Sequence, residues 1–268
     1  MKYLIAVDLE GAHDVTGEPY SGLKPGMSEY DKAVKNVTEE VNTAVEALFD
    51  GGADEVYVWD NHGNLDNLDF SVVDKRAKKV IPQNNSTLRL EFLNEGFNAM
   101  LFIGYHAKEG AINGVLAHTY DSSAIQYFRI DGKDAGEYDI DGMIASAFGV
   151  SVIFLSSDDV CVRDFSANFP QAHTAITKIG KGRNSAEEIE KSTVLGGIRT
   201  AVKEAVKKIP VCKSGCFPCS VEIRYTRTEF AAEKLCKLNA AGVRTVYGND
   251  AHVIIGTAKD VYELRKYL

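Results

Sequence analysis

Residues 2–11 of the chain read KYLIAVDLEG, and this stretch decides the fold. The apolar run Tyr3–Val7, which has a β-branched residue at its centre, is typical of a buried strand. Asp8 and Glu10 follow it, and because strand residues two apart share a face, both carboxylates are expected to point the same way. Both would then point into the crevice at the carboxyl end of a parallel strand, which is where ligands bind in open α/β sheets. Two such close acids repel each other unless a cation or a proton lies between them. The alternative is a solvated strand end whose acids face water.

Size and charge limit the class of protein. The 268 residues suffice for one large domain or two modest ones. The net charge of −8, from 30 basic and 38 acidic residues, argues against a nucleic-acid-binding protein, which usually has a basic face. No apolar run is long enough to span a membrane, and the chain starts with a strand where a signal peptide would have a basic start and a long apolar stretch. We therefore expect a cytoplasmic protein with no nucleic-acid or membrane partner and with its five cysteines reduced.

Two further strands are predicted to end close to a histidine. An amphipathic helix over residues 28–49 leads to a strand at 55–59, and Asp60-Asn61-His62-Gly63 follows that strand directly. A third strand at 98–103 is followed by Gly104-Tyr105-His106-Ala107. Because the carboxyl ends of parallel strands lie at the same edge of a sheet, we expect both histidines to converge with the acids of the first strand.

Glu137 begins a predicted helix at 137–148 and completes this set of side chains. The pattern predicts an α/β fold, with a parallel, Rossmann-like sheet in a metal-binding catalytic domain over residues 1–165. A smaller α+β lobe is predicted over residues 166–268, with a role in oligomerisation or in covering the site. Its longest helix is expected at 185–209, where Ser185 and Glu188 match a capping box. Other expected elements are a helix at 87–95, strands at 125–130, 150–155, 174–179, 220–225 and 244–247, and helices at 228–239 and 258–268.

The predicted cluster of carboxylates and imidazoles suits a transition metal. Mixed ligands of this kind favour zinc, manganese or iron over magnesium and calcium, which prefer oxygen ligands. Three acids and two histidines exceed the needs of one catalytic zinc, but if Asp8 bridges, two metals can each have three protein ligands and an open position. Such a pair can hold a hydroxide and polarise a carbonyl or phosphoryl oxygen. His118 is then left over near the site, available for acid–base or nucleophilic catalysis. The residues thus predict a metallohydrolase.

Five motifs together resemble the zinc-dependent D-aminopeptidase family associated with dipeptide-transport operons (the DppA type). The similarity covers about the first 160 residues and is faint beyond them. The motifs occur in the family's order and with similar spacing, and as a set they are specific. They are Val7-Asp8-Leu9-Glu10-Gly11, Asp60-Asn61-His62-Gly63, Leu101-Phe102-Ile103-Gly104-Tyr105-His106-Ala107, Gly114-Val115-Leu116-Ala117-His118 and Gly136-Glu137.

The resemblance implies a site, a reaction and an assembly. It implies two zinc ions bridged by Asp8. The same family pattern makes His118 the catalytic histidine, usually described as a nucleophile, although proton transfer is chemically at least as natural. The implied substrates are short peptides with an N-terminal D-amino acid, and the implied assembly is a ring-shaped homo-oligomer such as a decamer. The implied zinc ligand sets are Asp8, Glu10 and His62 for one ion and Asp8, His106 and Glu137 for the other.

The chain departs from the family pattern outside the ligands. Asn61 stands where the family usually has serine before its histidine, and residues 12–27 and the C-terminal lobe match poorly. These departures leave the ligands in place but put the substrate in doubt, because a relative acting on an L-peptide or another amide would keep the same metal site. A di-metal phosphoesterase and a metal-dependent binding protein are the alternatives. The first lacks an obvious basic cluster for phosphate, and the second has no need for His118.

A run of cysteines offers a separate alternative. Cys212, Cys216 and Cys219 have a spacing like that of an iron–sulfur cluster-binding run. Together with Cys236 they have the composition of a structural zinc site. The simplest interpretation is a connection with reduced cysteines that happen to be close in sequence. No Gly-x-Gly-x-x-Gly follows the first strand, which argues against a dinucleotide site.

Overall fold

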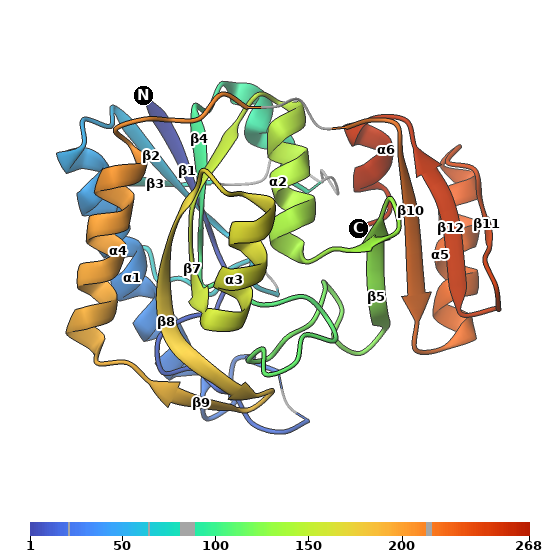
Figure 1. Cartoon of the computed structure of the whole chain (residues 1–268), viewed down its shortest axis with the longest axis horizontal. Coiled ribbons are helices and arrows are strands. Elements are labelled where there is room, and N and C mark those ends of the chain that lie inside the picture. Colours follow the sequence, from blue (N-terminus) through green and yellow to red (C-terminus); the bar gives the residue numbers. More distant parts are fainter. Residues whose placement is uncertain (21, 64, 81–88, 213–215) are drawn as a thin grey trace.

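A seven-stranded sheet, sheet A, forms the centre of the molecule (Figure 1). The computed structural model describes residues 1–20, 22–63, 65–80, 89–212 and 216–268. The strands are parallel to their neighbours except the last, which is antiparallel. In order across the sheet they are β3 (Ala77–Lys79), β2 (Glu55–Asp60), β1 (Lys2–Val7), β4 (Ala99–Ile103), β7 (Ser151–Asp158), β8 (His173–Gly182) and β9 (Ser185–Glu188).

The strand order locates a ligand crevice. Counted along the chain, the parallel strands of sheet A follow the order 3-2-1-4-5-6 of doubly wound nucleotide-binding folds. The direction of winding reverses between β1 and β4, and in such sheets ligands bind outside the carboxyl ends of the strands at this point. The predicted α/β fold with a parallel, Rossmann-like sheet is therefore confirmed.

Helices cover both faces of sheet A (Figure 1). Helices α1 (Tyr30–Asp50) and α4 (Lys191–Ala205) pack on one face. Helices α2 (Glu137–Ala147) and α3 (Asp159–Asn168) pack on the other. Successive residues of β1 alternate between the two resulting cores, and this explains why the strand is apolar throughout.

A second, antiparallel sheet B lies beside this layered unit (Figure 1). It is covered by α5 (Thr228–Ala240) and α6 (Val261–Arg265). Sheet membership crosses residue 165 in both directions, because β5 (Ile125–Ile130) and β6 (Lys133–Asp134) belong to sheet B while β8, β9 and α4 belong with sheet A. The two sheets therefore do not divide at residue 165, and the domain boundary there stays a prediction. Sheet B has the order β11 (Thr245–Tyr247), β12 (Val253–Ala258), β10 (Cys219–Tyr225), β5 (Ile125–Ile130) and β6 (Lys133–Asp134).

Several predicted elements differ from the structure. The helix expected at 185–209 begins only at Lys191, the first residue of α4, because residues 185–188 form β9 and pair with β8. The Glu190 side chain caps this helix by accepting a hydrogen bond from Thr193 N. The capping box at Ser185 was therefore wrong. The expected helix at 87–95 is a 3₁₀ helix, η1 (Glu91–Glu95), and residues 87 and 88 lie outside the described part of the chain. Strand β12 and helix α3 were not predicted. Within the described residues, no helix is both long and apolar enough to cross a lipid bilayer.

Candidate metal centre

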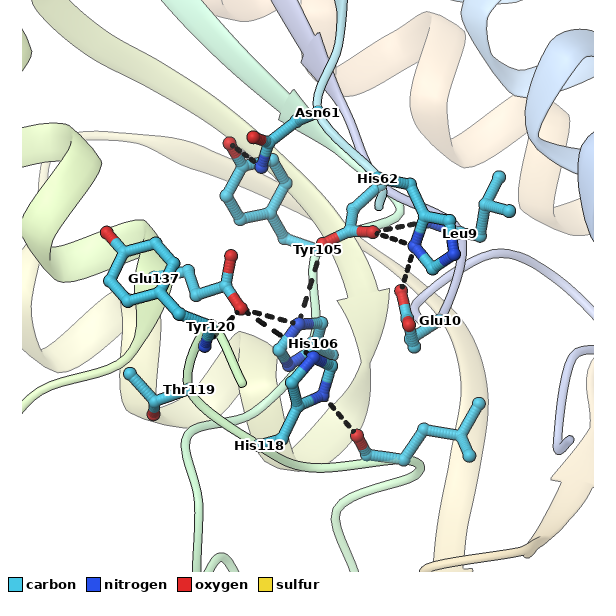
Figure 2. A network of polar contacts seen from close by, with 12 residues as sticks. Leu9, Glu10, Asn61, His62, Tyr105, His106, His118, Thr119, Tyr120 and Glu137 are labelled. Carbon is cyan, nitrogen blue, oxygen red and sulfur yellow. Dashed lines mark hydrogen bonds and ion pairs between the residues drawn. The ribbon is translucent and has the colours of Figure 1, made fainter. Parts of the chain in front are cut away.

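The five predicted metal ligands lie together at the crevice between β1 and β4. Figure 2 labels four of them, Glu10, His62, His106 and Glu137. Strand β1 leads directly into Asp8 and Glu10, β2 leads to His62, and β4 leads to His106. Glu137 reaches the same place from the first turn of α2. The convergence follows from the parallel register, because three adjacent strands end at one edge of the sheet.

His62 and two carboxylates form one half of the cluster. Its Nδ1 lies 2.8 Å from Asp8 Oδ1 and 3.2 Å from Glu10 Oε2. Its Nε2 lies 2.6 Å from the Leu23 carbonyl oxygen, to which it donates. A neutral ring in this orientation would present its Nδ1 lone pair to a cation, whereas Nδ1 must carry a proton to face two carboxylates directly. That arrangement is stable only with a cation or a proton between them.

His106 forms the other half. Its Nε2 lies 3.5 Å from Asp8 Oδ2 and 3.3 Å from Glu137 Oε1. The ring of His118 stacks on the ring of His106, with 3.9 Å between the ring centroids and an interplanar angle of 11°. His118 Nε2 lies 3.8 Å from Glu137 Oε1. His118 Nδ1 lies 2.8 Å from the Leu116 carbonyl oxygen, and this contact leaves Nε2 facing the cluster. The predicted catalytic histidine therefore borders the predicted ligands.

Burial and missing partners indicate what the cluster lacks. Asp8, Glu10, His106 and Glu137 are buried. Two of their atoms, Glu10 Oε2 and His106 Nε2, are buried without a hydrogen-bond partner among the described residues. Burial opposes ionisation of Asp8, but interactions with the neighbouring imidazoles of His106 and His62 outweigh it and hold the pKa of Asp8 well below its usual value. Burial likewise opposes ionisation of Glu137, and the neighbouring His106 outweighs it and lowers the pKa of Glu137.

The donor set fits a metal ion. Ligand atoms within 4.8 Å of one another occur in two overlapping groups of described residues. Carboxylate oxygens and imidazole nitrogens are the ligands that zinc and similar metals prefer, and unpartnered buried atoms are satisfied by such an ion. The groups are His106, His118 and Glu137, and Asp8, Glu10 and His106.

Close backbone approach fixes the positions of the ligands. Asp8 N donates to the Ile103 carbonyl oxygen at 2.9 Å, and Gly11 N donates to the Gly104 carbonyl oxygen at 2.7 Å. A Cβ at Gly11 would lie 1.8 Å from the Tyr105 carbonyl oxygen. Gly104 has φ +71°, and a Cβ there would lie 2.1 Å from the Asp8 carbonyl oxygen. Only glycine fits at either crossing point, so these two positions set the geometry of the crevice.

Lys178 supports the other side of the same segment. Its side chain is buried, and Nζ donates to the carbonyl oxygens of Glu10 and Ala12, both at 2.6 Å. The neighbouring Thr177 hydroxyl donates to the Gly11 carbonyl oxygen at 2.6 Å. Strand β8 therefore clamps the backbone that presents Glu10. The strand was predicted from sequence, but nothing in its pattern indicated this contact.

A second polar network was also missed. Asp141, one helical turn after Glu137, is fully buried and accepts hydrogen bonds from Arg89, Tyr105 and Tyr120. The signal available in the sequence was the i,i+4 spacing of two acids, which places both on one face of α2. Its partner Arg89 could not be found in this way, because it lies 52 positions away.

Other histidines and the cysteines lie apart from the cluster. His13 Nε2 lies 2.7 Å from the Ile189 carbonyl oxygen, and His252 Nδ1 lies 3.1 Å from that of Tyr225, so both have local backbone contacts. No disulfide joins the described cysteines, and the groups of described residues that could hold a metal contain no cysteine. The Cys212–Cys219 connection includes residues 213–215, which lie outside the described part of the chain.

Comparisons with known proteins identify the family of the chain. The family model described as D-aminopeptidase (Peptidase_M55) matches residues 1–268, and the resemblance to this family is thereby confirmed. A D-aminopeptidase of Bacillus subtilis (strain 168) is 26% identical over 178 residues. These cover 66% of this chain and 64% of the relative, so the match spans less than two thirds of that relative's length.

A solved structure has the same fold. It is described as "Zn-dependent D-aminopeptidase DppA from Bacillus subtilis, a self-compartmentalizing protease". The TM-score is 0.88 at 21% sequence identity, and the match covers 100% of this chain and 95% of the other. The likeness extends through the C-terminal residues, where the sequence motifs are faint.

Proposed function

The chain belongs to the M55 family of D-aminopeptidases, and on this premise we propose that it hydrolyses short peptides with an N-terminal D-amino acid at a di-zinc centre. The observation that carries the proposal is the orientation of Asp8. Its Oδ1 lies 2.8 Å from His62 Nδ1, and its Oδ2 lies 3.5 Å from His106 Nε2. A carboxylate whose two oxygens face different histidines is arranged as a bridge between two metal ions.

Each proposed ion has three protein ligands. One is held by Asp8, Glu10 and His62, and the other by Asp8, His106 and Glu137. Three protein ligands leave an open coordination position, as catalytic zinc sites require. A bound pair supplies Lewis acidity for the scissile carbonyl and lowers the pKa of water. The Zn-dependent structural relative supports zinc as the metal.

We assign proton transfer to His118. The contact of Nδ1 with the Leu116 carbonyl oxygen fixes the ring and keeps Nε2 towards the centre. The side chain is 14% exposed, so substrate can reach it. From this position Nε2 can take a proton from the attacking water and return it to the leaving amine. The alternative role as nucleophile needs the same Nε2, and trapping of a covalent intermediate distinguishes the two.

The assembly and the compartment form the second part of the proposal. The structural relative is described as self-compartmentalizing, and this supports a homo-oligomer for the present chain, with the ring and the decamer as finer predictions. We also propose a cytoplasmic location, where the cysteines would stay reduced. Analytical ultracentrifugation of the purified protein tests the assembly directly.

Metal content and stereoselective hydrolysis test the function. We expect close to two zinc ions per chain by elemental analysis and turnover of D-Ala-D-Ala in preference to L-Ala-L-Ala. The matched control is His118→Ala, which should keep the zinc and lose turnover. Two metals with no turnover of either dipeptide would refute the peptidase assignment while retaining the centre. A chain that binds no zinc when zinc is supplied would refute the centre itself.

A further inference from the structure

Asp141 is the centre of a buried polar network beside the proposed zinc ligands. It lies on α2 one turn after Glu137 and is fully buried. Its carboxylate accepts from Arg89 Nε at 2.5 Å and Arg89 Nη2 at 2.7 Å. It also accepts from the hydroxyls of Tyr105 at 2.9 Å and Tyr120 at 3.3 Å. One carboxylate therefore holds four donors from three separate segments.

Each tyrosine in this network is close in sequence to a histidine of the centre. Tyr105 directly precedes His106, and Tyr120 follows His118 by two positions. The third histidine is connected through one more residue, because Asn61, which precedes His62, donates from Nδ2 to the Tyr105 hydroxyl oxygen at 3.1 Å (Figure 2). All three histidine-bearing loops are thus tied to Asp141.

Arg89 extends the network to a proposed ligand. Its guanidinium lies over the rings of Trp59 and Tyr120, and its Nη2 lies 3.5 Å from Glu137 Oε2. The other oxygen, Glu137 Oε1, accepts from Tyr120 N at 2.8 Å and faces His106 Nε2. Arg89 therefore fixes which oxygen of Glu137 points into the centre.

We propose that Arg89 and Asp141 form a positioning pair that sets the geometry of the metal centre and, most directly, the binding of the ion held by His106 and Glu137. The inference rests on the proposed di-zinc function. Neither residue touches the reacting atoms; both act through the ligands and the histidine loops. The pair is neutral as a whole, so it orients the ligands without cancelling the charge of the three proposed carboxylates.

Stability alone gives little reason for such a pair. A buried ion pair is often no more stabilising than an apolar pair of the same volume, because both charges lose their hydration. The forked geometry of Arg89 on Asp141 is instead a means of fixing direction. Partners of this kind behind metal ligands typically contribute about 10–100-fold to metal affinity. This is the effect expected here, concentrated on one of the two ions.

The decisive variant is Arg89→Met/Asp141→Leu, which replaces both members of the pair by apolar side chains, so that neither is left as an unpaired buried charge. Zinc content is measured after dialysis against a zinc–chelator buffer of fixed free zinc, and the thermal unfolding midpoint is measured on the same samples. We expect the double variant to unfold within a few degrees of the wild type and to keep about one zinc per chain, with affinity for the second about 10–100-fold weaker. Wild-type zinc affinity in a folded double variant would overturn the proposal.

Two further samples keep the test interpretable. Tyr105→Phe/Tyr120→Phe removes both hydroxyl donors without changing charge, and it carries the test if the apolar pair does not fold. Unchanged zinc affinity in this variant would also overturn the proposal. The matched control is Arg129→Met/Glu222→Leu, which removes an ion pair of 3.1 Å in sheet B and should leave both zinc ions bound.

Failure of this inference is distinguishable from failure of the proposed function. If the wild type binds two zinc ions and all variants do so equally, only the positioning role is refuted. If the wild type itself binds fewer than two, the di-zinc centre is refuted together with this inference.

Discussion

Replacement of Gly104 by alanine tests whether the crossing of β1 and β4 controls the metal centre. Gly104 has φ +71°, a region that alanine adopts only with strain. Its new Cβ would lie 2.1 Å from the Asp8 carbonyl oxygen, and this neighbour is backbone and cannot rotate away. The substitution must therefore displace either strand end, and Asp8 is the residue proposed to bridge both ions.

The expected cost has two parts. A left-handed backbone costs an alanine about 1–2 kcal/mol. Forcing extra volume into a packed site costs a further 1–3 kcal/mol or so. Gly104→Ala should therefore lower the free energy of unfolding by about 2–5 kcal/mol. Because the overlap is with Asp8, zinc affinity should fall as well.

Gly149→Ala separates the two parts. Gly149 has φ +74°, but a Cβ there meets no atom within 4 Å. It should therefore cost only about 1–2 kcal/mol and leave zinc binding unchanged. The assay is urea unfolding of the metal-free proteins, followed by zinc titration. If Gly104→Ala costs no more than Gly149→Ala, or binds zinc as the wild type does, the close approach at Asp8 does not control the centre.

Three further predictions concern single side chains. Asp8→Asn should release both zinc ions while Glu137→Gln releases one; equal losses by elemental analysis would contradict the bridge. His118→Ala should lower kcat by about 10²–10⁴-fold at unchanged zinc content, and a kcat within tenfold of the wild type would exclude proton transfer. Burial raises the pKa of Glu40 to about 7. As the pH rises, Glu40 therefore loses its proton at a lower pH in the unfolded state than in the folded state, and the free energy of unfolding of the wild type should fall by about 3 kcal/mol between pH 4.5 and 7. Chemical unfolding of Glu40→Gln should show no such loss.

The candidate ligands could be predicted because each follows from local sequence and one topological rule. The run Tyr3–Val7 is apolar throughout because alternate residues face the two cores of sheet A. Parallel strands then place Asp8, His62 and His106 at one edge without any knowledge of the loops. The predicted and observed positions agree best for residues that directly follow an apolar strand of the parallel sheet.

Contacts between distant segments could not be predicted in this way. Residues 185–188 have a helix-start pattern, but pairing with β8 makes them a strand. Sheet B joins β5 to strands about 90 residues later, so the sequence division at residue 165 cuts across it. Lys178 and Arg89 have no local signal at all, since the role of each is defined by its contacts with segments distant in sequence. These partners are decided by tertiary packing, which overrides local preference.

The buried cations around the centre leave its negative charge for a metal. Arg89 is matched by Asp141, and Lys178 Nζ is occupied by two carbonyl oxygens while burial lowers its pKa to about 8. Neither cation therefore lies between the proposed ligands, where Glu10 Oε2 has no hydrogen-bond partner among the described residues. Buried carboxylates without compensation oppose folding. A bound metal would remove this cost, and a ligand that binds only the folded state at a thousand times its Kd stabilises it by about 4 kcal/mol. On this view metal binding is part of the folding free energy of the crevice as well as of its chemistry.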